Sequence, residues 1–285
     1  MHQPQPGISA AVTRFAPSPT GLLHLGHAHS ALFAWRAGNR FLLRIEDIDP
    51  GRCREEFVEA IFTDLAWLGL TWETPVRRQS GHLDDYRAAL DRLAGMGLLY
   101  PCFCTRREIE DEIARSGHAP HGPEGVLYPG TCRRLDPAEV RARLDAGIPH
   151  ALRLDVARAS AIAGPLHWHD REAGRQRAQP DLFGDVVLAR KDVPTSYHLA
   201  VTVDDALQGV TLVTRGRDLF DATHVHRLLQ ALLGLPVPEY AHHGLLTDET
   251  GRRFAKRDKS LTLASLREAG RSAAEVRAMA GFADQ

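Results

Sequence analysis

Residues 11–27 read AVTRFAPSPTGLLHLGH and predict a strand, a turn and the start of a helix in immediate succession. The run AVTRF is short and mostly apolar, as expected of a buried strand, and the Pro- and Gly-rich stretch after it is typical of a turn. A helix is expected over residues 27–37, ended by Gly38 and Asn39. Because free N–H groups and the positive dipole end of a helix bind anions, this segment predicts a phosphate site.

The same order of elements continues along the chain. Residues 41–47 (FLLRIED) predict a second buried strand. Two amphipathic helices should follow, since apolar residues recur at helical spacing: Phe57, Ile61, Leu65 and Leu68, then Leu83, Tyr86, Leu90 and Leu93. Further on, strands are expected at residues 186–190, 198–205 and 210–216, and a helix at 225–232. This order predicts an α/β fold with a parallel sheet.

Residues 100–185 interrupt the α/β order. They contain three of the four cysteines, a Gly-, Pro- and His-containing loop, a charged helix around residues 137–146 and a polar stretch at 168–181. We therefore predict a Rossmann-type parallel-sheet nucleotide-binding domain that is split by an insertion domain. The expected division is a first half at 1–99, an insertion at 100–185, a second half at 186–240, and a loop with a short helical tail at 241–285.

Composition limits the class of protein. The 285 residues have a formal net charge of −1, 44% are hydrophobic and 25% are charged, which is ordinary for a globular protein and argues against nucleic-acid binding by bulk electrostatics alone. No apolar run approaches the roughly 18 residues of a membrane span, and the start MHQPQPGISA lacks the pattern of a signal peptide. We therefore expect a cytoplasmic protein that does not enter a membrane.

Two histidines stand at the predicted helix start. His24 and His27 are separated by two residues, so both imidazoles can face a phosphate bound there and stabilise the charge that grows in a transition state. Gly26, between them, allows a ligand to approach the backbone closely. The alternative is a pair of exposed loop histidines, and the strand–turn–helix context favours the phosphate site.

These residues carry a resemblance to a known family. The tetrapeptide His24-Leu-Gly-His27 resembles the HIGH element of class I aminoacyl-tRNA synthetases, and RFAPSPTGLLHLGH together with FLLRIEDIDP at 41–50 resembles their glutamyl branch. The resemblance continues through residues 195–205 and 209–219 and ends at RRFAKRDKS (252–260), where the KMSKS element belongs. Only Lys256 keeps a lysine position of that element. The resemblance implies ATP with Mg²⁺, bound by His24, Gly26, His27 and Lys256, with His24, His27 and Lys256 catalytic.

The resemblance also implies a glutamate pocket. The matching positions are Arg14, Phe15, Ala16, Pro17, Ser18, Glu46, Tyr197 and Arg215. Arg14 and Arg215 would hold carboxylates, because a guanidinium fork matches carboxylate geometry, and Glu46 would hold the ammonium. Surface ion pairs are the alternative for either arginine alone. Glu46 lies in an apolar strand, where a carboxylate needs a partner.

The insertion contains a candidate metal site. Cys102-Phe-Cys104 precedes Tyr128-Pro-Gly-Thr-Cys132, so three thiols are available for the four ligands of a structural zinc site. The fourth ligand is a histidine, His118 or His121, or Tyr128. The arrangement resembles the short glutamyl-queuosine synthetases, which implies Tyr128. One structural Zn²⁺ would then stabilise the insertion, and buried free thiols without metal are the alternative.

Chain length refines the expected function. The sequence continues only about 25 residues past the KMSKS-like element, whereas a full glutamyl-tRNA synthetase carries a large anticodon-binding part. The short members are the glutamyl-Q tRNA(Asp) synthetases, so the resemblance implies a monomer that activates L-glutamate without tRNA and transfers it to queuosine in the anticodon loop of tRNA(Asp). The alternatives are a discriminating glutamyl-tRNA synthetase that charges a 3′ end, another nucleotidyltransferase such as a cytidylyltransferase, and a catalytically dead amino-acid- or RNA-binding paralogue.

Overall fold

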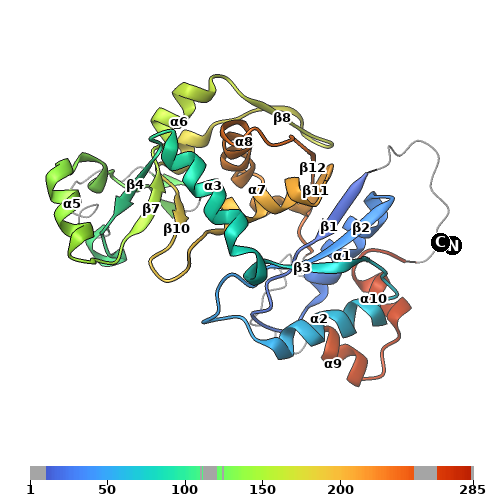
Figure 1. Cartoon of the computed structure of the whole chain (residues 1–285). Helices are drawn as coiled ribbons and strands as arrows, with labels where there is room; N and C mark the ends of the chain where they lie inside the picture. Colours follow the sequence, from blue (N-terminus) through green and yellow to red (C-terminus); the bar gives the residue numbers. More distant parts are fainter. Residues whose placement is uncertain (1–10, 110, 112–120, 124, 247–261, 284–285) are drawn as a thin grey trace.

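The computed structural model describes residues 11–109, 111, 121–123, 125–246 and 262–283. Its first part is a parallel α/β unit (Figure 1) made of β1 (Val12–Phe15), α1 (Leu25–Ala37), β2 (Arg40–Ile45), α2 (Glu55–Trp67) and β3 (Glu73–Arg78). The three strands lie in the order β1-β2-β3 and are parallel. This confirms the predicted strand–turn–helix start. Strand β3 was not predicted, because its half-exposed residues ETPVRR show no apolar alternation.

A second parallel group lies beside the first. It consists of β11 (Leu212–Gly216), β12 (Glu239–His243) and the hairpin of β8 (His167–Asp170) and β9 (Gly174–Arg177). These strands lie in the order β11-β12-β8-β9, and β12 is parallel to both β11 and β8. The Val12 N–H donates to the Thr211 hydroxyl at 2.9 Å and the Thr211 N–H donates to the Val12 carbonyl at 3.0 Å, which brings β11 next to β1. The ends of β1 and β11 therefore meet at one edge.

The strand predicted at residues 198–205 is wrong, because this stretch forms the helix α7 (Tyr197–Leu207). All residues from His198 to Asp205 are buried, so the apolar pattern has no helical period and resembles that of a buried strand. The signal for a helix was Ser196, whose side chain accepts a bond from the Leu199 N–H as an N-cap.

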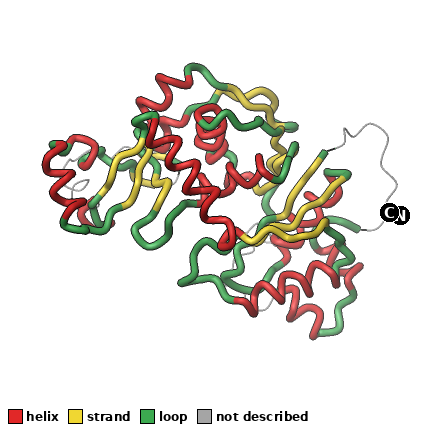
Figure 2. The backbone as a smooth tube through the Cα atoms, viewed as in Figure 1, coloured by secondary structure: helices red, strands yellow, loops and turns green. Residues whose placement is uncertain are grey.

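A small antiparallel sheet lies apart from the parallel strands (Figure 2). Its order is β10-β7-β4, from β4 (Leu99–Cys102), β7 (Ala151–Leu154) and β10 (Val187–Ala189). The strand expected at 186–190 thus forms, but in this sheet. The hairpin β8–β9, although it lies within residues 100–185, pairs with the parallel group instead.

Helices pack against these sheets (Figure 1). The remaining long ones are α3 (Leu83–Gly95), α5 (Pro137–Asp145), α6 (Val156–Ala163) and α8 (Ala222–Leu232), and two short helices of the predicted tail follow, α9 (Leu263–Glu268) and α10 (Ala273–Met279). One apolar core lies between α1, α2, β2 and the tail helices. A second joins α3, α7 and α8 to β10. Within the described part of the chain, no helix is long and apolar enough to cross a membrane.

Candidate active site

A cavity of about 450 Å³ opens where β1 and β11 end and α1 begins. The residues around it come from separate segments of the chain and include every predicted glutamate and phosphate residue that the structure describes: Arg14, Phe15, Ala16, Pro17, Ser18, His24, Gly26, His27, Glu46, Tyr197 and Arg215. Lys256 lies outside the described residues. The fold thus places the predicted residues around one cavity, and their individual roles stay predictions.

The start of α1 is built from the two histidines. His24 is the N-cap residue, and its Nδ1 accepts a bond from the Gly26 N–H at 3.1 Å, while Nδ1 of His27 accepts from the His24 N–H at 3.2 Å. A neutral imidazole that accepts at Nδ1 carries its proton on Nε2. Each ring therefore has an Nε2–H donor. The ring centroids are 3.8 Å apart, so two such donors lie together at the helix start.

A glycine at position 26 has a structural role in addition to the predicted one of allowing a ligand close to the backbone. A Cβ atom at this position would lie 3.0 Å from the ring of His24. Glycine therefore allows the His24 imidazole to fold back over the first turn and cap it, which places both rings at the cavity.

Arg14 forms an internal ion pair. Its Nε and Nη2 donate to the two carboxylate oxygens of Asp205 at 3.0 and 3.3 Å, and its Nη1 donates to the Thr214 carbonyl at 2.9 Å. Although burial opposes ionisation of Asp205, the guanidinium groups of Arg14 and Arg44 hold the pKa of this carboxyl below its usual value. The charge of Arg14 is therefore compensated within the protein.

Arg215 has neutral partners instead. Its Nε donates to His242 Nε2 at 3.0 Å, its Nη1 to His226 Nδ1 at 3.1 Å and its Nη2 to the Thr223 hydroxyl at 2.5 Å. The side chain is buried, and among the residues that the structure describes no carboxylate forms an ion pair with it. A guanidinium has five N–H donors, so these bonds do not exhaust it. An uncompensated buried cation at a cavity wall suits an anionic ligand.

Glu46 provides the acidic side of the cavity. Its carboxylate accepts a bond from Arg44 Nη2 at 3.1 Å. Burial raises the pKa of the Glu46 carboxyl by more than the nearby Arg44 and Arg14 lower it. An ammonium group bound beside Glu46 would favour its ionised form, since an opposite charge stabilises a carboxylate.

Arg44 is the partner that Glu46 was expected to need, and the sequence analysis missed it. It is fully buried and also donates to Asp205 at 2.7 Å, so it holds α7 against β2. The sequence contained a signal for this pair. Arg44 lies in one apolar segment and Asp204-Asp205 in another, and buried charges need partners of opposite sign.

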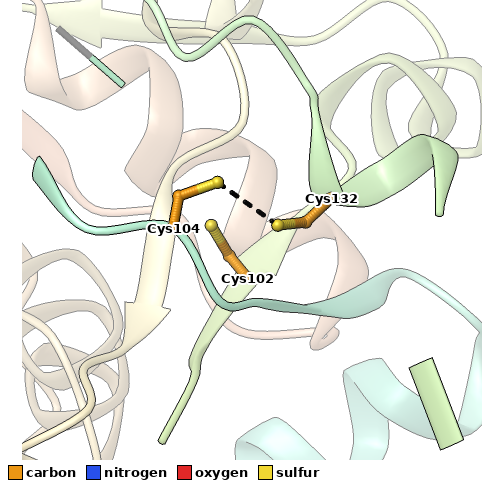
Figure 3. Close-up of side chains that lie close together, drawn as sticks. All are labelled: Cys102, Cys104 and Cys132. Atoms are coloured by element: carbon orange, nitrogen blue, oxygen red, sulfur yellow. Dashed lines mark hydrogen bonds between the residues drawn. The ribbon is translucent and has the colours of Figure 1, made fainter. Parts of the chain in front are cut away.

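The three predicted cysteine ligands come together in space. The sulfur atoms of Cys102, Cys104 and Cys132 lie within 4.8 Å of one another and point to a common centre (Figure 3). Tyr128 lies beside them, because its hydroxyl oxygen accepts a bond from the Cys132 N–H at 2.8 Å and is 3.6 Å from the Cys104 sulfur. Three thiols and a phenol fit the four-ligand set of a tetrahedral metal site. His118 and the side chain of His121 lie outside the described residues.

Several known proteins share much of this sequence. The family described as tRNA synthetases class I (E and Q), catalytic domain, matches residues 10–277. The chain is 50% identical to the glutamyl-Q tRNA(Asp) synthetase of Rhodobacter capsulatus, over 95% of this chain and 100% of that protein. It is 41% identical to glutamate–tRNA ligase 2 of Nitrosococcus oceani, over 92% of this chain and 57% of the ligase.

A solved structure gives the same result for the fold. The glutamate tRNA ligase of Elizabethkingia meningosepticum, determined in complex with its amino acid, superposes with a TM-score of 0.71 at 28% identity. The superposition covers 88% of this chain and 52% of the ligase, so the chain spans about half of the length of that protein.

Proposed function

The chain belongs to the family of class I tRNA synthetase catalytic domains for glutamate and glutamine, and from this premise we propose a two-step reaction. L-Glutamate is activated with ATP to glutamyl-adenylate without tRNA, and the glutamyl group is transferred to queuosine in the anticodon loop of tRNA(Asp). The observation that carries the first step is Arg215, a buried guanidinium without a carboxylate partner among the described residues, in a cavity shared with Glu46, His24 and His27.

The activation step uses these residues as follows. Arg215 binds a carboxylate of glutamate, and Glu46 accepts the ammonium group. A glutamate α-carboxylate oxygen attacks the α-phosphorus of ATP, a new O–P bond forms, and the bond to the pyrophosphate oxygen breaks. The Nε2–H groups of His24 and His27 donate to phosphate oxygens as their charge grows, and Lys256 contributes an ammonium. Mg²⁺ bound with ATP supplies further charge neutralisation.

ATP–pyrophosphate exchange tests this step. Purified protein with ATP, labelled pyrophosphate and L-glutamate should form labelled ATP in the absence of tRNA. Lys256→Ala should reduce the exchange rate at least ~100-fold, about 2.7 kcal/mol, because its ammonium meets the transition state. Lys259→Ala is the matched control and should retain the exchange. Exchange with glutamine instead of glutamate would reassign the substrate.

Similarity to named relatives supports queuosine as the acceptor. The chain is 50% identical to the R. capsulatus protein, one of several relatives with this activity in their names, and 41% identical to the N. oceani ligase. A second cavity of about 430 Å³ is lined by Ser18, Glu46 and Tyr197, which also line the first, and we place the acceptor there. There a queuosine hydroxyl attacks the adenylate carbonyl carbon, AMP leaves, and its phosphate takes the proton.

The acceptor is tested with matched tRNAs. Labelled glutamate should be transferred to tRNA(Asp) that carries queuosine, including the same modified tRNA trimmed of its 3′ CCA, and not to tRNA(Asp) that lacks queuosine. Equal charging with and without queuosine refutes the assignment. Loss of charging on removal of the CCA end favours a glutamyl-tRNA synthetase that acts at the 3′ end.

We further propose that Cys102, Cys104, Cys132 and Tyr128 bind one structural Zn²⁺. The support is the geometry of three thiols with the Tyr128 hydroxyl beside them. Tyr128→Phe should lower the zinc content of purified protein, whereas Tyr100→Phe, whose hydroxyl instead donates to Asp185 at 2.6 Å, should retain it. Unchanged zinc in Tyr128→Phe would assign the fourth position to a histidine.

A further inference from the structure

We propose that Asp170, His242 and His226 form an imidazole clamp that orients Arg215 toward a carboxylate of the substrate without neutralising its charge. The inference rests on the proposed glutamate activation and assigns positioning residues to it. The clamp comes from three elements: Asp170 ends β8, His242 lies in β12 and His226 lies in α8.

The first arm of the clamp is a buried carboxylate–imidazole pair. Nδ1 of His242 is 2.8 Å from Asp170 Oδ2, and both side chains are 1% exposed. The other carboxylate oxygen, Oδ1, accepts backbone bonds from Glu172 and Ala173 at 3.0 and 2.8 Å. These bonds hold Asp170 in the turn of the β8–β9 hairpin, so the carboxylate presents a fixed acceptor to His242.

The hydrogen bonds determine the tautomer of His242. A guanidinium only donates, so His242 Nε2, which is 3.0 Å from Arg215 Nε, must accept. The ring proton is then on Nδ1, where it is donated to Asp170. Asp170 therefore fixes the one neutral form of His242 that can hold Arg215, as second partners of imidazoles do in other sites.

The second arm of the clamp is His226, whose hydrogen bonds determine its tautomer in the same way. Nδ1 of His226 accepts from Arg215 Nη1 at 3.1 Å, so its proton is on Nε2, which is 3.1 Å from His198 Nδ1. Burial first, and then the charge of Arg215, hold the pKa of His226 well below its usual value, and burial and Arg215 do the same for His242. Both imidazoles are therefore neutral acceptors at neutral pH.

Neutral acceptors explain why this arginine is suited to a ligand. A carboxylate in the place of His242 would form an ion pair, as Asp205 does with Arg14, and would remove the attraction for an anionic substrate. Imidazoles fix the guanidinium plane by hydrogen bonds and keep the Asp170 carboxylate one ring away, so that Arg215 forms no direct ion pair with it. The ring of Tyr240, stacked on His242 and 5.6 Å from the Arg215 guanidinium carbon, contributes a further neutral contact.

Two substitutions of His242 distinguish the roles of its two ring nitrogens. The carbonyl of Gln reaches the place of Nε2 and can accept from Arg215, whereas Asn reaches only the place of Nδ1 and leaves Arg215 without this acceptor. In the exchange assay, His242→Asn should raise KM for glutamate at least about 10-fold and change KM for ATP less than about 2-fold. His242→Gln should stay within about 3-fold of the wild type for both, and His169→Asn, an exposed position in β8, is the control.

The outcomes distinguish the clamp from the proposed function. Absence of glutamate-dependent exchange in the wild type overturns the proposed function and the clamp with it. Wild-type exchange with equal effects of Gln and Asn, or with KM for ATP raised as much as KM for glutamate, overturns only the clamp.

A spectroscopic measurement covers the case in which His242→Asn does not fold. Protein labelled with ¹⁵N-histidine reports the tautomer of each neutral ring, and the signal that disappears in His242→Gln identifies His242. The clamp requires the Nδ1–H form for His242 in the wild type. The Nε2–H form or a charged ring at neutral pH would overturn it.

Discussion

Arg14 and Arg215 occupy neighbouring strands, line the same cavity and are both buried, yet their surroundings differ. Arg14 is bound by both oxygens of Asp205, whereas Arg215 is bound by two imidazoles and a hydroxyl. The residue type and the degree of burial are therefore not enough to identify a ligand-binding arginine. We expect the charge of its partners to be informative, because a guanidinium paired with a carboxylate attracts an anionic ligand less strongly than one with neutral partners.

The largest expected effect is on activity at Arg215. Arg215→Met should lower kcat/KM for glutamate in the exchange assay at least ~1000-fold, about 4 kcal/mol, since a desolvated carboxylate of the substrate loses its charged partner. The same comparison should be made for ATP, whose KM should change little. A decrease of less than about 10-fold would contradict the binding role of Arg215.

The next effect is on stability, where the order of the two arginines should reverse. Arg14→Met leaves Asp205 buried with one guanidinium fewer and should lower the free energy of unfolding by about 3 kcal/mol. Arg215→Met should lower it by no more than about 1 kcal/mol, because the loss of neutral hydrogen bonds is offset by removal of an uncompensated buried charge. Urea unfolding of both variants measures the two losses of unfolding free energy. Equal losses would remove the distinction between the two sites.

A smaller effect concerns pH. Burial and Arg215 lower the pKa of His242 from its ordinary 6.5 to about 4, against the opposing influence of Asp170. The unfolded chain therefore binds more protons at this position between pH 6.5 and 4, so the stability contributed falls as pH falls through this range. Between pH 6.5 and 5 the wild type should lose about 2 kcal/mol more unfolding free energy than His242→Gln. Parallel pH profiles would contradict this.

The smallest effect is that of a single neutral bond. Thr223→Val removes the hydroxyl that Arg215 Nη2 contacts and should raise KM for glutamate about 5-fold, near 1 kcal/mol. Thr13→Val is the matched change on the Arg14 side, since the buried Thr13 hydroxyl donates to the Ala34 carbonyl at 2.8 Å. It should affect stability and leave KM unchanged. A larger KM change in Thr13→Val than in Thr223→Val would contradict the comparison.

Local signals in the sequence predicted much of this molecule. The strand, the turn and the His24-containing helix start follow one another within 17 residues, and the cysteine spacing predicted the cluster around Tyr128. Long-range partners were not predictable in this way. Asp205 is 191 residues from Arg14, and its segment was expected to be a strand because a helix buried on all sides shows no period. Asp170 lies in a polar stretch whose pairing with β12 has no local sequence signal.

Calorimetric titration of L-glutamate into the wild type and into Arg215→Met, at neutral pH without ATP or tRNA, tests the central claim most directly. We predict that the wild type binds glutamate and that Arg215→Met binds it at least about 100-fold more weakly while it keeps the thermal midpoint of the wild type. Wild-type affinity in a folded Arg215→Met protein would contradict the claim that this uncompensated arginine binds the substrate.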